Sequence, residues 1–122
     1  MRSQGQISLS LHSAVEILAG PALMAAPLLI DFPVFAGLVS FALGALLIGL
    51  ALAGHAGQGE RGTIPLSAHA AFDRIIGVVA IVIGVALGLA GGFAAAAVFM
   101  AGFGIAHLAL TAATRFTAPL GA

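Results

Sequence analysis

Residues 34–54 read VFAGLVSFALGALLIGLALAG, a continuous run without a charged side chain. A helix needs about 20 apolar residues to cross the hydrocarbon core of a bilayer, and this run meets that length. Three further stretches do so as well: residues 8–30, 66–90 and 93–114. The sequence therefore predicts an all-α integral membrane protein, a four-helix bundle.

The composition of the whole chain supports this interpretation. Of its 122 residues, 61% are hydrophobic and only 7% are charged, whereas about a quarter of the residues of a soluble domain are charged. So few charges cannot cover a water-facing surface, and the apolar surface must face lipid. We expect one transmembrane domain over residues 1–122 and the lipid bilayer as its first partner.

The breaks between the apolar stretches are short. Residues 31–33 contain a proline, which disfavours helix in the residue before it, and residues 91–92 are two glycines. Both turns fit only antiparallel helix hairpins. Residues 55–65 form the polar connection, after which Ser67 is expected to cap the third helix.

The composition also excludes several kinds of chemistry. Cysteine is absent, which removes disulfides, thiolate metal sites and cysteine nucleophiles. A net charge of zero offers no footprint for nucleic acid. No catalytic motif is found, so we expect a protein that is not an enzyme.

The arginines predict the orientation in the membrane. Arg2, Arg61, Arg74 and Arg115 all fall on one side of a four-span topology, while Asp31 lies on the other. The positive-inside rule then places the arginines and both termini in the cytoplasm. Together with the alanine, glycine and arginine bias, this favours the inner membrane of a bacterium.

The two halves of the chain look duplicated. Residues 10–16 (SLHSAVE) align with residues 67–73 (SAHAAFD), and Gly20 then aligns with Gly77. Each half holds two helices and inserts in the same orientation. This predicts two hairpins related by a pseudo-twofold axis along the membrane normal, a parallel repeat.

Small residues follow one face of each predicted helix. Such stripes let membrane helices approach closely. The glycines expected at these contacts are Gly20, Gly44, Gly77, Gly84, Gly88 and Gly104. Gly84 and Gly88 form a GxxxG pattern, which is typical of a close contact inside the bundle or of a dimerisation face.

Ionisable residues gather toward the arginine side. The candidate polar cluster consists of His12, Glu16, His69, Asp73, Arg74 and His107. Glu16, Asp73 and His107 should lie on the order of 10 Å inside the membrane, where ionisable groups are costly and face the protein interior or a wet cavity. In a purely structural interpretation Arg74 either pairs with Glu16 or extends to the lipid headgroups, and Asp73 pairs with His12, His69 or His107.

No cofactor is predicted in the structural interpretation, and three functional interpretations remain open beside it. The paired His-x-x-x-carboxylate motifs place two ligands on one face of each helix, which suits a divalent metal. Two opposed histidines can instead hold haem b between helices. The same side chains can also line a pathway for protons or a small solute.

Residues 20–32 (GPALMAAPLLIDF) resemble the core of small bacterial SPW-repeat membrane proteins. In those proteins a helix carries a glycine and a Ser-Pro-Trp motif, and a two-helix unit is duplicated; here residues 26–28 read Ala-Pro-Leu. The chain also resembles uncharacterised four-helix membrane proteins through residues 67–73 and 107–115. The resemblance implies the architecture and no activity.

The sequence thus favours a non-enzymatic protein that is either a structural or accessory subunit of a larger membrane complex or a self-associating subunit of a homo-oligomer. A small ion, proton or solute transport protein is the alternative, and a membrane haem b protein is a further one.

Overall fold

The computed structural model describes residues 5–56 and 64–116, which form four helices. They are α1 (Leu9–Leu29), α2 (Val34–Ala56), α3 (Leu66–Ala90) and α4 (Ala94–Ala113). Each predicted range agrees with its helix to within two residues. All four helices are long and apolar enough to cross a membrane. The prediction of an all-α four-helix membrane protein is confirmed.

The helix ends follow local sequence. Ser8 caps α1, its hydroxyl accepting a hydrogen bond from the Leu11 amide at 3.1 Å. The N-cap of α3 is Pro65, so the prediction of Ser67 was wrong by two residues. Gly91 and Gly92 have φ angles of 80° and 88°, which favour glycine and allow the tight turn into α4. Within the predicted polar connection 55–65, residues 57–63 lie outside the described part of the chain.

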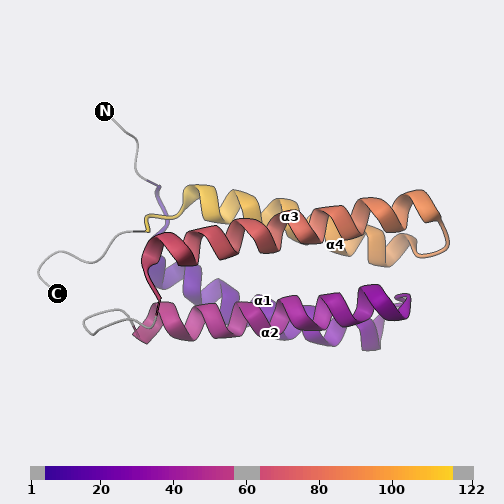
Figure 1. Cartoon of the computed structure of the whole chain (residues 1–122), viewed down its shortest axis with the longest axis horizontal. Coiled ribbons are helices and arrows are strands. Elements are labelled where there is room, and N and C mark those ends of the chain that lie inside the picture. Colours follow the sequence, from indigo (N-terminus) through magenta and orange to yellow (C-terminus); the bar gives the residue numbers. More distant parts are fainter. Residues whose placement is uncertain (1–4, 57–63, 117–122) are drawn as a thin grey trace, which may run out of the picture.

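The helices form two antiparallel hairpins, α1 with α2 and α3 with α4, laid side by side (Figure 1). We call the end where α1 and α3 begin the arginine end, because Arg74 and Arg115 belong to it. The opposite end, which carries the two short interhelical turns, is the turn end.

Each hairpin is held together by close backbone contacts at glycines. In the first hairpin, a Cβ atom on Gly20 would lie 2.8 Å from the carbonyl oxygen of Gly44 and 2.6 Å from Cγ1 of Ile48. In the second, a Cβ atom on Gly104 would lie 2.6 Å from the carbonyl oxygen of Gly77. Only hydrogen fits at these positions, which lets the helix backbones touch.

The contacts of the two hairpins match. Gly77 faces Leu108 as Gly20 faces Ile48. A duplicated hairpin is expected to show such matched contacts, although the duplication itself stays a prediction. Gly84 adds a second close approach in the second hairpin, to Ala101, whereas the exposed Gly88 has only a methyl group 4.0 Å away.

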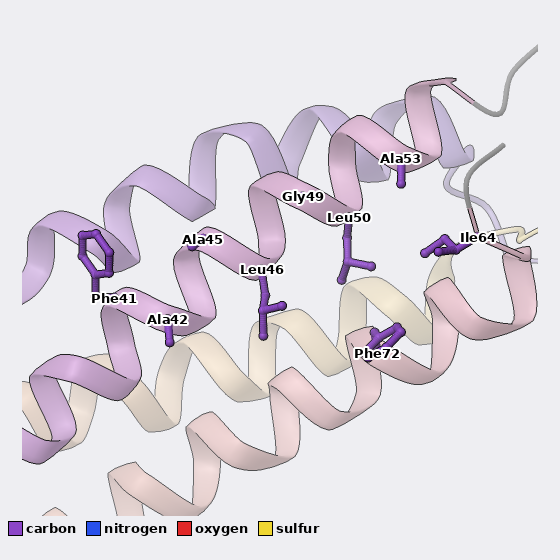
Figure 2. A pocket seen from close by; sticks show the side chains of 9 residues that line it. All are labelled: Phe41, Ala42, Ala45, Leu46, Gly49, Leu50, Ala53, Ile64 and Phe72. Atoms are coloured by element: carbon purple, nitrogen blue, oxygen red, sulfur yellow. The ribbon is translucent and has the colours of Figure 1, made fainter.

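Between the membrane-spanning parts of the two hairpins, side chains rather than backbones make the contacts. The fully buried core contains Leu23, Leu47, Ile76 and Met100, from all four helices. Beside this core an apolar groove runs between α2 and α3. Side chains of α2 line one side of the groove, and Phe72 of α3 lies on the other side (Figure 2). Exposed leucines, valines and phenylalanines cover the rest of the bundle, as expected of a surface that faces lipid.

Candidate functional site

Five of the six predicted cluster residues meet inside the bundle near the arginine end. α1 contributes His12 and Glu16, α3 contributes His69 and Asp73, and α4 contributes His107. On α1 and α3 the histidine and the carboxylate are four residues apart and share one helix face. The first four residues have no exposed surface, and His107 is 4% exposed.

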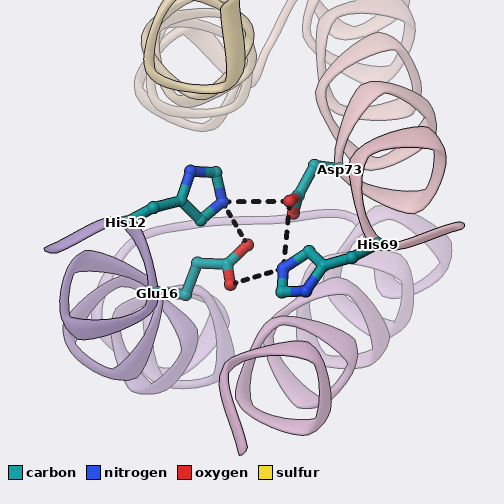
Figure 3. A group of neighbouring side chains, drawn as sticks. All are labelled: His12, Glu16, His69 and Asp73. Atoms are coloured by element: carbon teal, nitrogen blue, oxygen red, sulfur yellow. Dashed lines mark hydrogen bonds and ion pairs between the residues drawn. The ribbon is translucent and has the colours of Figure 1, made fainter. Parts of the chain in front are cut away.

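The four residues of α1 and α3 alternate around one point (Figure 3). His12 Nε2 lies 3.1 Å from Glu16 Oε2 and 2.9 Å from Asp73 Oδ2. His69 Nε2 lies 3.4 Å from Glu16 Oε1 and 3.2 Å from Asp73 Oδ2. One ligand atom from each residue lies within 4.8 Å of the other three. We call these four residues the His/carboxylate centre.

The other ring nitrogen of His12 reveals its tautomer. The Thr114 hydroxyl donates its single hydrogen to the Leu110 carbonyl at 2.6 Å, so at His12 Nδ1, 2.8 Å away, it can only accept. His12 must therefore carry a hydrogen on Nδ1. Its Nε2 then presents to the two carboxyl groups either a second proton or a lone pair, and a lone pair there faces either a proton on one of the carboxyls or a cation.

His69 has no such partner. Its Nε2 lies within ion-pair distance of both carboxylates but lacks hydrogen-bond geometry to either of them. Its Nδ1 and Glu16 Oε1 are likewise buried without a hydrogen-bond partner. Unsatisfied buried polar atoms cost free energy. Two of these three atoms point into the centre, where an ion bound between them would satisfy them.

His107 lies beside the centre rather than in it. Its Nε2 is 3.1 Å from Asp73 Oδ1, the oxygen opposite the one shared by His12 and His69. Phe103, one turn earlier on α4, stacks on the His107 ring at 5.3 Å with an angle of 16°. His107 Nε2 also lies 3.8 Å from Glu16 Oε2, so it contacts both carboxylates and holds Asp73 the more closely.

Arg74 does not join the cluster. Its side chain is exposed, and no ion pair links it to Glu16. Neighbouring residues on a helix point about 100° apart, so a residue next to the inward-facing Asp73 turns away from the interior. The expected pairing of Arg74 with Glu16 is wrong for this reason.

The structure adds contacts that sequence reasoning missed. Thr114, the C-cap of α4, binds His12, and the ring of Phe116 lies 5.2 Å from His12 and 5.6 Å from His69. Thr114 continues the α4 face of His107 and Thr111, which was a usable signal. Phe116 lies beyond the helix, and no periodicity pointed to it.

The centre carries two carboxylates in an apolar surrounding. An uncompensated charge at such a place is very costly, so each carboxyl is either neutralised by its own proton or balanced by a positive charge. Protons on the two imidazoles supply this balance, and so does one divalent ion. A haem is less well matched, because the carboxylates fill the space between the two Nε2 atoms (Figure 3).

No protein-family model, curated protein or solved structure matches the chain. The resemblance to SPW-repeat proteins stays a prediction. What characterises this protein is a four-helix membrane bundle with a buried centre of two histidines and two carboxylates.

Proposed function

We propose that this protein binds a divalent first-row transition metal ion inside the membrane, between His12, Glu16, His69 and Asp73. The observation that carries the proposal is the convergence of four buried ligand atoms from two helices to within 4.8 Å of one another. Neither hairpin holds these ligands alone, so the ion joins the two halves of the bundle.

The spacing of the ligand atoms supports a tetrahedral ion. With metal–ligand bonds of about 2.0–2.1 Å, neighbouring donors in a tetrahedron lie roughly 3.3 Å apart. The four nitrogen-to-oxygen contacts run from 2.9 to 3.4 Å, and they use both oxygens of Glu16, Oε2 toward His12 and Oε1 toward His69. To bind the ion through one oxygen, the Glu16 carboxylate must turn so that this oxygen faces both histidines.

The donor types favour particular metals. Two imidazoles and two carboxylates suit Zn²⁺, Fe²⁺ and Mn²⁺, whereas Cu⁺ prefers sulfur and Ca²⁺ prefers an all-oxygen shell. Four protein ligands complete a tetrahedral shell without an open position, which is typical of structural rather than catalytic zinc sites. This agrees with the expectation that the protein is not an enzyme.

The surroundings of the ligands support the same proposal. Metal-bound histidines usually donate their second ring N–H to an oxygen, which fixes the ring. His12 has this partner in Thr114 Oγ1 at 2.8 Å, and Asp73 is held by His107 at 3.1 Å. We place the centre in the cytoplasmic half of a bacterial inner membrane, since the arginine asymmetry favours that orientation.

Metal analysis of the purified protein tests the proposal. Protein stripped with a chelator in detergent is titrated with Zn²⁺, Fe²⁺ under reducing conditions, and Mn²⁺. We expect one tightly bound ion per chain and loss of binding in the double variant Glu16→Gln/Asp73→Asn. Asp31→Asn, which changes an exposed carboxylate near the turn end, is the matched control.

Two results would contradict the proposal. One is the absence of stoichiometric binding for all three ions. The other is equal binding by the parent protein and the Glu16→Gln/Asp73→Asn variant, which would place the metal elsewhere. In either case the centre would be a proton-balanced network that fixes helix register, as in the structural interpretation. Self-association remains a separate prediction, tested by the mass of the protein in detergent.

A further inference from the structure

We propose that the metal enters and leaves the centre only from the arginine end, through a cap formed by residues 5–8 and 113–116, with Phe116 as the side chain that must move. This rests on the proposed function. It makes the protein a one-sided metal store or sensor rather than a pathway across the membrane.

The route toward the turn end is closed by packed hydrocarbon. In the core, on the turn-end side of the centre, lie Leu23, Leu47, Ile76 and Met100, each at most 1% exposed. Among the described residues deeper than the centre, the one buried polar side chain is Ser40, and its hydroxyl donates to the Leu23 carbonyl at 2.7 Å. A desolvated divalent ion finds no ligand to step onto in this direction.

The other side of the centre is covered by two short chain segments that pair with each other. The Ile7 amide donates to the Ala113 carbonyl at 2.9 Å, and the Arg115 amide donates to the Ile7 carbonyl at 2.8 Å. The Arg115 guanidinium adds a hydrogen bond to the Gly5 carbonyl at 2.9 Å. These bonds tie the segment before α1 to the segment after α4.

The cap touches the ligands directly. Phe116 lies edge-on to His12, with an interplanar angle of 70°, and at 56° to His69. Thr114 from the same segment binds His12 Nδ1. An ion can reach the ligand atoms from this end only after the ring of Phe116 has moved away.

The cap is held in place by a few hydrogen bonds and by the ring of Phe116, whereas a continuous hydrophobic core fills the bundle toward the turn end. Short segments with few buried contacts open far more often than packed helices do. Opening of the cap therefore sets the rates at which metal binds and dissociates. Phe116 supplies no ligand atom, so removing its ring changes those rates and leaves the affinity nearly unchanged.

The test compares Phe116→Ala with the parent protein by stopped-flow, using Zn²⁺ and a fluorescent zinc chelator. We expect both the association and the dissociation rate constants for Zn²⁺ to rise roughly tenfold or more, because Phe116→Ala removes the ring contacts with His12 and His69 that hold the cap closed. The dissociation constant should stay nearly unchanged. Phe35→Ala removes an exposed ring of α2 and is the matched control. Unchanged rates in Phe116→Ala would refute the cap.

A second measurement addresses the side of access. Zn²⁺-loaded protein is reconstituted into liposomes in one orientation, which is verified with an N-terminal tag, and a membrane-impermeant chelator is added outside. We expect removal of Zn²⁺ only when the arginine end faces outward. Removal from both sides would overturn one-sided access.

Failure of this inference is distinguishable from failure of the proposed function. If Zn²⁺ does not bind at equilibrium, the metal centre itself is refuted. If one ion binds tightly but Zn²⁺ binds to and dissociates from Phe116→Ala at the rates of the parent protein, the metal centre is supported and the proposed role of the cap is refuted. A rise in the dissociation rate alone would show that Phe116 supports the ligands rather than gating them, and would also refute the cap.

Discussion

Replacing Asp73 with asparagine removes the carboxylate that makes the closest contact with a histidine in the bundle interior. Three histidines lie within 3.2 Å of its oxygens: His12 at 2.9 Å, His107 at 3.1 Å and His69 at 3.2 Å. The amide that replaces one oxygen donates hydrogens and cannot accept from these rings. One negative charge is lost while the positive charge that balanced it stays buried.

The size of the effect follows from that loss. Removing one partner of a buried ion pair typically costs about 3–5 kcal/mol. We expect Asp73→Asn to fall in this range for the metal-free protein. Glu16→Gln should cost less, because its histidine contacts are longer, from 3.1 to 3.8 Å.

The assay is reversible unfolding in mixed micelles, following helix content as the fraction of SDS rises, with a chelator present. The exposed Asp31→Asn serves as the control and should stay within about 0.5 kcal/mol of the parent protein. The double variant Glu16→Gln/Asp73→Asn should lose less than the sum of the single losses, since neutral histidines then need no counter-charge. If Asp73→Asn were as stable as Asp31→Asn, the charge balance described for the centre would be wrong.

Three further predictions follow from the same structure. Gly104→Leu should disrupt the second hairpin and lower its stability in micelles by several kcal/mol, whereas Gly88→Leu, at an exposed position with open space, should change it by less than about 1 kcal/mol. Thr114→Val should weaken Zn²⁺ binding by about 10- to 100-fold in a competition titration, because His12 loses its Nδ1 partner. Thr111→Val is the control: it removes a hydroxyl that has no hydrogen-bond partner and should leave Zn²⁺ binding unchanged. Zn²⁺ binding should release at least one proton, measured by calorimetry in two buffers of different ionisation enthalpy; no release would mean that His12 Nε2 carries no proton in the metal-free protein.

The sequence was sufficient to predict the helices. Apolar runs of membrane-spanning length, separated by proline and glycine turns, leave little choice of architecture, and the bounds agree closely. The i,i+4 spacing of His12 with Glu16 and of His69 with Asp73 also predicts which side chains share a face. The depth of His107 could be counted from the end of its helix.

The geometry of the centre could not be predicted in the same way. Spacing along one helix does not say which ring nitrogen meets which oxygen across helices. Arg74 was included in the candidate cluster although its neighbour Asp73 occupies the inward face. The cap depends on a pairing between Ile7 and Thr114, residues from the two ends of the chain. No local periodicity predicts a contact of that kind.

Glycine contacts hold each hairpin together, whereas the histidines and carboxylates of the centre join the two hairpins, and this has a consequence for how the protein is assembled. Each hairpin is self-contained through its own glycine contacts, yet each holds only half of the ligands, one histidine and one carboxylate. Two separately expressed hairpins should therefore insert and fold independently, then associate in proportion to the available metal. A fluorescent protein divided between the two pieces would report this complementation, and the chain would become a genetically encoded indicator of the free metal concentration at the membrane.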